Sequence, residues 1–185
     1  VEPGARQLTA TRAGETDPVT IEADVIVGAD GPRSVVAAAT GVARPARLGP
    51  RVGLTFHLAD GRDDDGALDA RMVRLRDGYV GIAPVPGGRV NVGIVLGGSW
   101  RPALAREGAA TIARRVLASI APTADDPATW YAQTPLDRVE GAWPLGHRVT
   151  RRAGPGWMLV GDAAGFLDPF TGEGLHRAFV SARLA

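Results

Sequence analysis

The residues best suited to chemistry lie in the run from Gly161 to Gly174. This run follows an apolar segment, residues 156–161, that predicts a buried strand, and it leads into a predicted helix. Ligands of α/β proteins gather where strands end and helices begin, so the run is a candidate ligand site. Asp162, just past the strand, can accept hydrogen bonds from hydroxyl groups. Gly172 and Gly174 would let main-chain N–H groups at the helix start meet an electron-rich ring edge.

A similar but shorter unit lies near the N-terminus. The apolar run from Ala23 to Gly28 predicts a strand, and a helix is expected to follow the loop at Asp30. Pro32 suits the first position of that helix, and Gly41 suits its C-terminal stop. Taken alone, this segment predicts a turn and a helix start rather than a site.

Taken together, the two segments resemble the paired motifs of FAD-dependent oxidoreductases with the p-hydroxybenzoate hydroxylase fold. Residues 160–174 are similar to the GD motif of that family, and residues 27–34 are similar to its DG motif. The motifs occur in the family order, and the resemblance covers nearly the whole chain. It implies an α/β (α+β) fold in which a Rossmann-like FAD-binding layer is interrupted by a β-rich substrate domain.

Carried over position by position, the resemblance implies that Asp162 hydrogen-bonds the ribityl chain of FAD and that Pro169 lies beside the isoalloxazine. Main-chain N–H groups near Gly172 would face the N1/C2=O edge of the flavin. The DG segment would lie near the pyrophosphate, and its link to pyridine nucleotides implies NAD(P)H as electron donor. A carboxylate facing a reduced flavin would oppose its charge, so Glu173 is expected to turn away. The implied cofactor-binding residues are Asp30, Gly31, Gly161, Asp162, Ala163, Pro169, Gly172, Glu173 and Gly174.

Between the two motifs the sequence changes to alternating polarity. The predicted strands cover residues 51–59, 70–77, 79–85 and 89–97, and apolar residues at fourfold spacing predict one long helix over 103–120. The predicted domains are therefore a DG segment at 1–45, a β-rich substrate domain at 46–142 and a GD segment at 143–185. A Gly-x-Gly-x-x-Gly segment normally opens this fold, and no such segment occurs in the chain. We therefore expect an N-terminally truncated domain, which alone would bind FAD weakly and be inactive.

Within the family, the run from Gly165 to Gly174 is closer to geranylgeranyl reductase-like proteins than to aromatic hydroxylases. Residues 79–84 fall where those reductases carry Tyr-x-Trp-x-Phe-Pro, but Gly81 and Ala83 replace the two large rings. The stretch also lacks the paired Trp of flavin halogenases. The prediction is a reductase-like enzyme for a hydrophobic small molecule. Candidate substrate contacts are Tyr79, Pro84 and Trp143, and no catalytic residue is assigned.

Two alternatives stay open at this point. One is an FAD-dependent monooxygenase, which would use the same flavin cradle. The other is a non-catalytic remnant that does not bind FAD. The upstream reading frame separates the remnant from the enzymes, because an enzyme needs the missing glycine-rich segment.

Composition excludes several other classes. Hydrophobic residues make up 45% of the 185 residues and charged residues 22%, which disfavours disorder, and a net charge of +1 with interleaved signs disfavours nucleic-acid binding. The chain has no Cys, and its three His are not at ligand spacing, so no metal site is predicted. No apolar run is long enough for a membrane span. The default expectation is a cytoplasmic protein, with peripheral membrane association left open for a longer chain.

Overall fold

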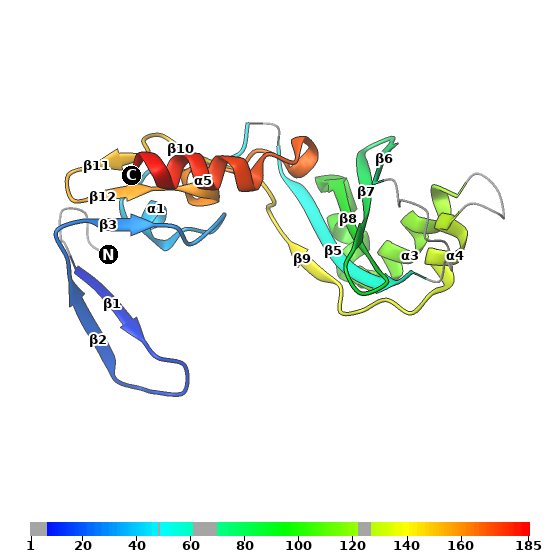
Figure 1. The fold of residues 1–185 in the computed structure, drawn as a ribbon, viewed down its shortest axis with the longest axis horizontal. Coiled ribbons are helices and arrows are strands. Elements are labelled where there is room, and N and C mark those ends of the chain that lie inside the picture. The colour runs from blue at the N-terminus through cyan, green and yellow to red at the C-terminus, as the bar shows by residue number, and fades with distance from the viewer. Residues whose placement is uncertain (1–6, 48, 61–69, 122–126) are drawn as a thin grey trace. The chain divides into compact units, whose positions relative to one another are not determined.

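The computed structural model describes residues 7–47, 49–60, 70–121 and 127–185. Its chain divides into two compact units, a first unit of residues 1–49 and 145–185 and a second unit of residues 50–144. The first unit thus joins the blue N-terminal elements and the orange to red C-terminal elements of Figure 1. The boundaries predicted at 45/46 and 142/143 lie close to this division.

The second unit is built on a five-stranded antiparallel sheet in the order β6-β7-β8-β5-β9 (Figure 1). The strands are β5 (Arg51–Ala59), β6 (Arg71–Leu75), β7 (Gly78–Val85), β8 (Arg89–Gly97) and β9 (Glu140–Ala142). The four predicted strands are confirmed, whereas β9 is too short to give an alternating pattern. Because side chains alternate along a strand, one face of the sheet carries the buried residues of the core, such as Leu54, Val92 and Ile94.

Helices of the second unit pack against that core. They are α2 (Arg101–Glu107), α3 (Ala109–Ser119) and α4 (Pro127–Gln133), with a short 3-10 turn η1 (Gly98–Trp100) before α2. The prediction of one long helix over 103–120 is wrong, because Gly108 adopts a φ of 84° that ends α2 and begins α3. A left-handed residue cannot continue an α-helix, and glycine adopts this conformation at little cost. The apolar stripe still serves its purpose, since Ile112 and Val116 are buried.

The first unit contains the two strand–loop–helix segments. Its three-stranded sheet has the order β11-β12-β3, in which β12 (Trp157–Leu159) pairs in parallel with β3 (Ile26–Gly28) and antiparallel with β11 (Ala153–Gly154). Helix α1 (Val35–Ala39) follows β3. The 3-10 turns η2 (Gly161–Ala164) and η3 (Pro169–Thr171) lead from β12 to helix α5 (Gly174–Leu184). Both predicted segments are confirmed.

Local details of α1 correct the expectation for Pro32. The helix is capped by Ser34, whose Oγ accepts a hydrogen bond from the N–H of Ala37 at 3.0 Å. Pro32 lies in the preceding turn and is not the first helical residue. Gly28 allows β3, β12 and α1 to approach, since a Cβ there would lie 2.7 Å from Leu159 and 2.9 Å from Val36.

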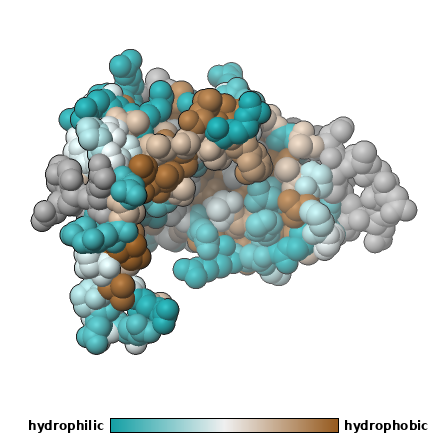
Figure 2. Space-filling model, turned by 60° about the vertical axis from the view of Figure 1, so that its left-hand side comes forward, coloured by the Kyte–Doolittle hydropathy of each residue, from teal (hydrophilic) through white to brown (hydrophobic). Residues whose placement is uncertain are grey.

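Two further strand pairs complete the first unit. A hairpin joins β1 (Gln7–Thr11) to β2 (Pro18–Glu22), and β4 (Ala43–Pro45) pairs with β10 (His147–Val149) across a long stretch of sequence. Hydrophobic residues remain at the surface (Figure 2), including Leu175 and Phe179 on α5, which are exposed. Among the described helices, none is long and apolar enough to cross a membrane.

Candidate functional site

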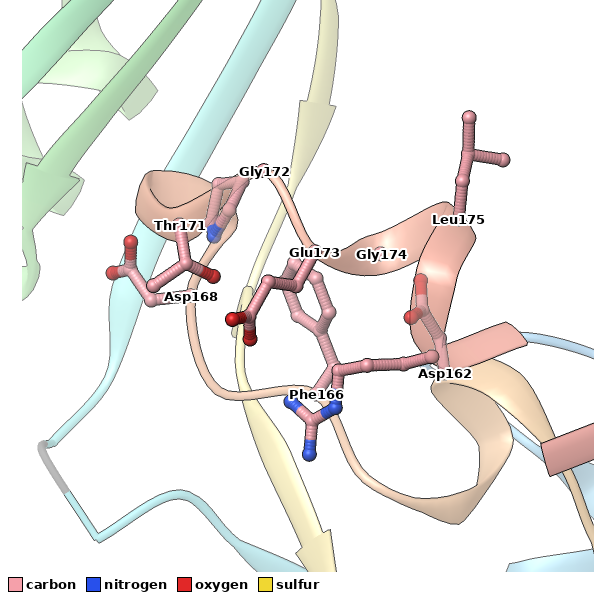
Figure 3. A pocket seen from close by; sticks show the side chains of 10 residues that line it. Asp162, Phe166, Asp168, Thr171, Gly172, Glu173, Gly174 and Leu175 are labelled. Carbon is pink, nitrogen blue, oxygen red and sulfur yellow. The ribbon is translucent and has the colours of Figure 1, made fainter. Parts of the chain in front are cut away.

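The loops between β12 and α5 curve around a cavity of about 240 Å³ that lies within the first unit (Figure 3). We call it the loop cavity. Five of the nine predicted cofactor-binding residues line it, namely Asp162, Pro169, Gly172, Glu173 and Gly174. The lining residues absent from that prediction are Phe166, Asp168, Thr171, Leu175 and Arg177. Arg177 could have been inferred, because it lies one helical turn after Gly174 on the same side of α5.

Hydrogen bonds fix the shape of this segment. The N–H of Gly161 donates to the Ser181 hydroxyl at 2.8 Å, which ties the end of β12 to α5. A carboxylate oxygen of Asp168 accepts from the N–H of Phe170 at 2.9 Å, and this bond begins η3. Gly172 ends η3 in the left-handed region, at φ 68°, with its N–H on the carbonyl of Pro169 at 3.0 Å. The chain therefore turns sharply just before α5 and leaves the N-terminus of this helix uncovered.

Open hydrogen-bond donors gather at the start of α5. Glu173 occupies the N-cap but makes no capping bond with its side chain, and the first helical bond runs from the N–H of Arg177 to its carbonyl at 2.9 Å. Within the described residues, the N–H groups of Gly174 and Leu175 have no acceptor. These donors and the partial positive charge of the helix terminus favour an electron-rich or anionic group.

Carboxylates border the same space. Asp162, Asp168 and Glu173 all line the loop cavity, and Figure 3 shows their side chains around it. Among the residues that the structure describes, the Asp162 carboxylate has no hydrogen-bond partner, so it is available to a ligand hydroxyl. Glu173 also lines the cavity, and its side chain makes no capping bond. That it turns away from a reduced flavin stays a prediction.

The DG segment has a different role in the structure. A carboxylate oxygen of Asp30 accepts a hydrogen bond from the N–H of Val35 at 2.6 Å, so the side chain caps α1. Burial raises the pKa of the Asp30 carboxyl, but hydrogen bonds from the Ser34 side chain and the Val35 N–H outweigh it and hold that pKa below its ordinary value. Asp30 and Gly31 do not line the loop cavity. The cap accounts for Asp30 without a cofactor.

Two other predicted cofactor residues also lie outside the lining. Ala163 is fully buried in the core of the first unit, so it has no surface for a ligand, and its small size serves packing. Gly161 holds α5 through Ser181, as described above. The structure thus brings five of the nine predicted residues together at the loop cavity and places the other four outside its lining.

Candidate substrate contacts are dispersed over the second unit. Tyr79 and Pro84 lie on opposite faces of β7, because they are an odd number of residues apart in an unbroken register with β8. Trp143 packs against the core, with the Arg101 guanidinium 5.3 Å from its ring centroid. Pro84, with Val80 and Ile82, also belongs to the core-facing side. Tyr79 alone lies on the opposite face.

Comparison with known proteins identifies the family. The FAD binding domain family matches residues 4–182, so the chain belongs to that family. The α/β fold class inferred from the resemblance is confirmed.

Relatives include enzymes of two kinds. Menaquinone reductase of Mycobacterium tuberculosis is 34% identical over 133 residues, which cover 71% of this chain and 29% of that protein. Digeranylgeranylglycerophospholipid reductase of Methanothrix thermoacetophila is 31% identical over 182 residues, or 96% of this chain and 43% of that protein. Among solved structures, the flavin-dependent halogenase CmlS has a TM-score of 0.77 at 26% identity, over 95% of this chain and 32% of that one. The chain spans less than half the length of these relatives.

The site residues suit the flavin half of FAD. An unpaired carboxylate at Asp162 can accept from a hydroxyl, and the open N–H groups of α5 can face a ring edge rich in oxygen and nitrogen. Nothing lies within 4 Å of where a Cβ would stand at Gly172 or Gly174, so the approach to these groups is clear. At about 240 Å³ the cavity is smaller than the roughly 300–1,000 Å³ of ordinary ligand pockets, so it can surround only part of FAD.

Proposed function

We propose that the chain is the FAD-binding portion of a flavin-dependent oxidoreductase that reduces a hydrophobic small molecule. The loop cavity carries this proposal, because it places an unpaired carboxylate and the open start of α5 around one space. The printed names of the relatives, reductases of a quinone and of an isoprenoid lipid, support the reductase class. NAD(P)H as electron donor and a cytoplasmic location belong to the same proposal.

The residues of the chain have separate tasks in this function. When bound, FAD supplies hydride and electron transfer. Asp162 orients the cofactor by accepting a hydrogen bond from its ribityl chain. The N–H groups at the start of α5 stabilise negative charge at the pyrimidine edge, since they are fixed in place before the reaction. Pro169 and Phe166 present apolar surface that excludes water from that edge.

For the substrate, the candidate surface is the non-core face of the second unit, on which Tyr79 is mostly buried. Gly81 and Gly93 are directly paired across β7 and β8 on the same face as Tyr79. No heavy atom lies within 4 Å of a Cβ built on Gly93, whereas the end of the Met72 side chain lies 3.6 Å from one built on Gly81, so the open space is on the Gly93 side of this pair. We propose that Tyr79 and the paired glycines contact the substrate, while Pro84 and Trp143 support the core.

An FAD-dependent monooxygenase is the second candidate. The likeness to CmlS, at 26% identity over 95% of the chain, favours it, because that protein is a flavin-dependent halogenase. A monooxygenase needs the same contacts to FAD, so the loop cavity does not separate the two classes. They differ in whether the reduced enzyme passes its electrons to an unsaturated substrate or to oxygen.

The test uses the purified full-length protein. We expect it to retain FAD through gel filtration and, after anaerobic reduction, to be reoxidised by a quinone or an isoprenoid alkene without oxygen. Reoxidation that requires oxygen and yields a hydroxylated product would instead establish the monooxygenase. A protein that carries no FAD and binds none would overturn both and leave the non-catalytic remnant.

A further inference from the structure

A second cavity of about 280 Å³ lies within the first unit, between the pair β4 and β10, the loop that follows η2, and α5. We call it the arginine cavity. Its lining residues are Ala46, Arg47, His147, Arg148, Val149, Arg152, Ala164, Gly165, Phe166, Leu167 and Arg177. None of the predicted cofactor-binding residues is among them. Phe166 and Arg177 line both cavities, so the two spaces are neighbours.

The two cavities differ sharply in charge. The loop cavity has three carboxylates and one arginine in its lining, whereas the arginine cavity has four arginines and no Asp or Glu. Within the described residues, Arg47, Arg148 and Arg177 form no ion pair or side-chain hydrogen bond. Arg152 uses only its Nε, which donates to the carbonyl of Ala164 at 3.3 Å. Most of the guanidinium donors around this cavity are therefore free for an anion.

His147 provides an independent observation. Both of its ring nitrogens are buried, and neither has a hydrogen-bond partner in the part of the chain that the structure describes. The main chain of His147 is fixed, because its N–H donates to Phe166 at 2.8 Å and its carbonyl accepts from the Phe166 N–H at 3.0 Å. Buried polar atoms in native proteins are nearly always satisfied. The two ring nitrogens of His147 at this cationic cavity therefore call for a hydrogen-bond partner, and a bound ligand would supply one.

The backbone around His147 is also shaped for close packing. A Cβ at Gly146 would lie 2.8 Å from the carbonyl oxygen of Leu167 and 3.2 Å from the Cβ of Ala46. The glycine thus lets the loop after η2 lie against β10 and the end of β4. These three elements, distant in sequence, are held together by this contact and by the His147–Phe166 bridge. The cavity is therefore a built feature of the first unit.

We propose that the arginine cavity binds a phosphate group of a ligand other than FAD. Guanidinium groups match phosphate oxygens with paired hydrogen bonds, and the imidazole N–H of His147 can add another donor. The phosphate comes either from a dinucleotide electron donor or from a lipid headgroup, and both would bring the ligand beside the loop cavity. The site does not depend on which reaction the enzyme catalyses.

Calorimetry on the FAD-loaded full-length protein tests the site with inorganic phosphate and pyrophosphate as probes. We expect saturable binding that Arg148→Gln and Arg47→Gln each weaken about tenfold, since each removes a charge-assisted hydrogen bond. Arg151→Gln is the matched control, because Arg151 is an exposed neighbour of Arg152 outside the lining. Equal effects of all three changes, or no binding by the parent protein, would overturn the proposal.

Nuclear magnetic resonance of the histidine rings gives a second readout. Pyrophosphate should shift the ring nitrogens of His147 and leave those of exposed His176 unchanged. Bound FAD should stay the same in the Arg47 and Arg148 variants. If both variants release FAD, the cavity belongs to the flavin site, and the inference of a separate phosphate site is wrong.

Two further arms distinguish the sources of the phosphate. For a dinucleotide, Arg148→Gln should raise the KM for NADPH or NADH about tenfold with little change in kcat. For a lipid headgroup, the same variant should lose binding to phosphatidylglycerol vesicles, measured against phosphatidylcholine vesicles, and keep its KM. Either result supports the site, whereas an unchanged KM together with unchanged vesicle binding would overturn it as a ligand site of the enzyme.

Discussion

The two units of the chain differ in how completely they bury their apolar residues. The second unit encloses a core in which Leu58, Ile94 and Leu117 are fully buried. The core of the first unit is a smaller cluster of mostly small side chains around Val36 and Leu159. Among the described residues, every large hydrophobic side chain that remains exposed belongs to the first unit, with Met72 as the exception.

Sheet structure shows the same contrast. In the second unit, β8 lies at the centre of a sheet whose core face is covered by helices. In the first unit, β3 pairs in parallel with β12 but is an edge strand of a three-stranded sheet. Val25 just before β3 and Val27 within it are about half exposed. Parallel strands are normally covered on both faces. The second unit is therefore self-sufficient, whereas the unit that carries the site depends on further contacts.

The largest expected effect compares a buried and an exposed apolar side chain. In the 185-residue chain, Ile94→Ala should lower the free energy of unfolding by about 2–5 kcal/mol, because it leaves a cavity in a closed core. Phe179→Ala on α5 should change it by less than about 0.5 kcal/mol, because that side chain is 72% exposed. Urea unfolding followed by circular dichroism measures both. A large loss of unfolding free energy from Phe179→Ala in this chain would contradict the difference in burial between the two units.

The proposed contact between Asp162 and FAD gives the next effect. In the full-length protein, Asp162→Ala should weaken FAD binding about ten- to a hundredfold, because it removes a charge-assisted hydrogen bond of about 1.5–3 kcal/mol. Fluorescence quenching of FAD measures the affinity. Asp17→Ala, in the exposed turn of the β1–β2 hairpin, is the control and should leave affinity unchanged. Equal affinity in both variants would show that Asp162 does not contact FAD.

Alanine substitutions at two glycines, one in each unit, test how tightly the surroundings of each glycine are packed. A Cβ at Gly28 would lie 2.7 Å from Leu159, so Gly28→Ala should destabilise the first unit by about 1–3 kcal/mol through overpacking. Gly93→Ala should have a much smaller effect, because no heavy atom lies within 4 Å of its Cβ position. Thermal unfolding of the 185-residue chain measures both changes. If Gly93→Ala lowered the stability and Gly28→Ala did not, the assignment of tight packing at Gly28 and open packing at Gly93 would be wrong.

Sequence patterns predicted those features whose causes are local. The alternation in β5 and β8 gave both strands with their observed bounds, and the glycine-rich run after β12 located the loop cavity. The break at Gly108 was missed because the apolar spacing continues across it. The arginine cavity could not be predicted, since it depends on pairing β4 with β10, about a hundred residues later.

The same limit applies to Asp30 and α5. The motif alone does not show that the Asp30 carboxylate is used by the Val35 N–H, because that depends on how the loop turns. Periodicity predicts an apolar face on α5, but it does not state what covers that face. The path of the loop decides the first and packing against other segments decides the second, and the sequence pattern of the segment itself states neither.

The smallest expected effect concerns pH and the cap of α1. Hydrogen bonds hold the pKa of Asp30 below its ordinary value in the folded chain, so the ionised carboxylate stabilises the fold at neutral pH. This stabilisation is present above the pKa of the unfolded state and is lost as the pH falls through the lower pKa of the folded state. Asp30→Asn keeps an oxygen that can accept from the Val35 N–H but cannot titrate. Its unfolding free energy should therefore fall less between neutral and acidic pH than that of the parent chain.

Urea unfolding at a series of pH values measures the difference, with Asp17→Asn as an exposed control. An identical pH dependence in the parent and Asp30→Asn chains would show that the cap of α1 does not depend on the charge of Asp30.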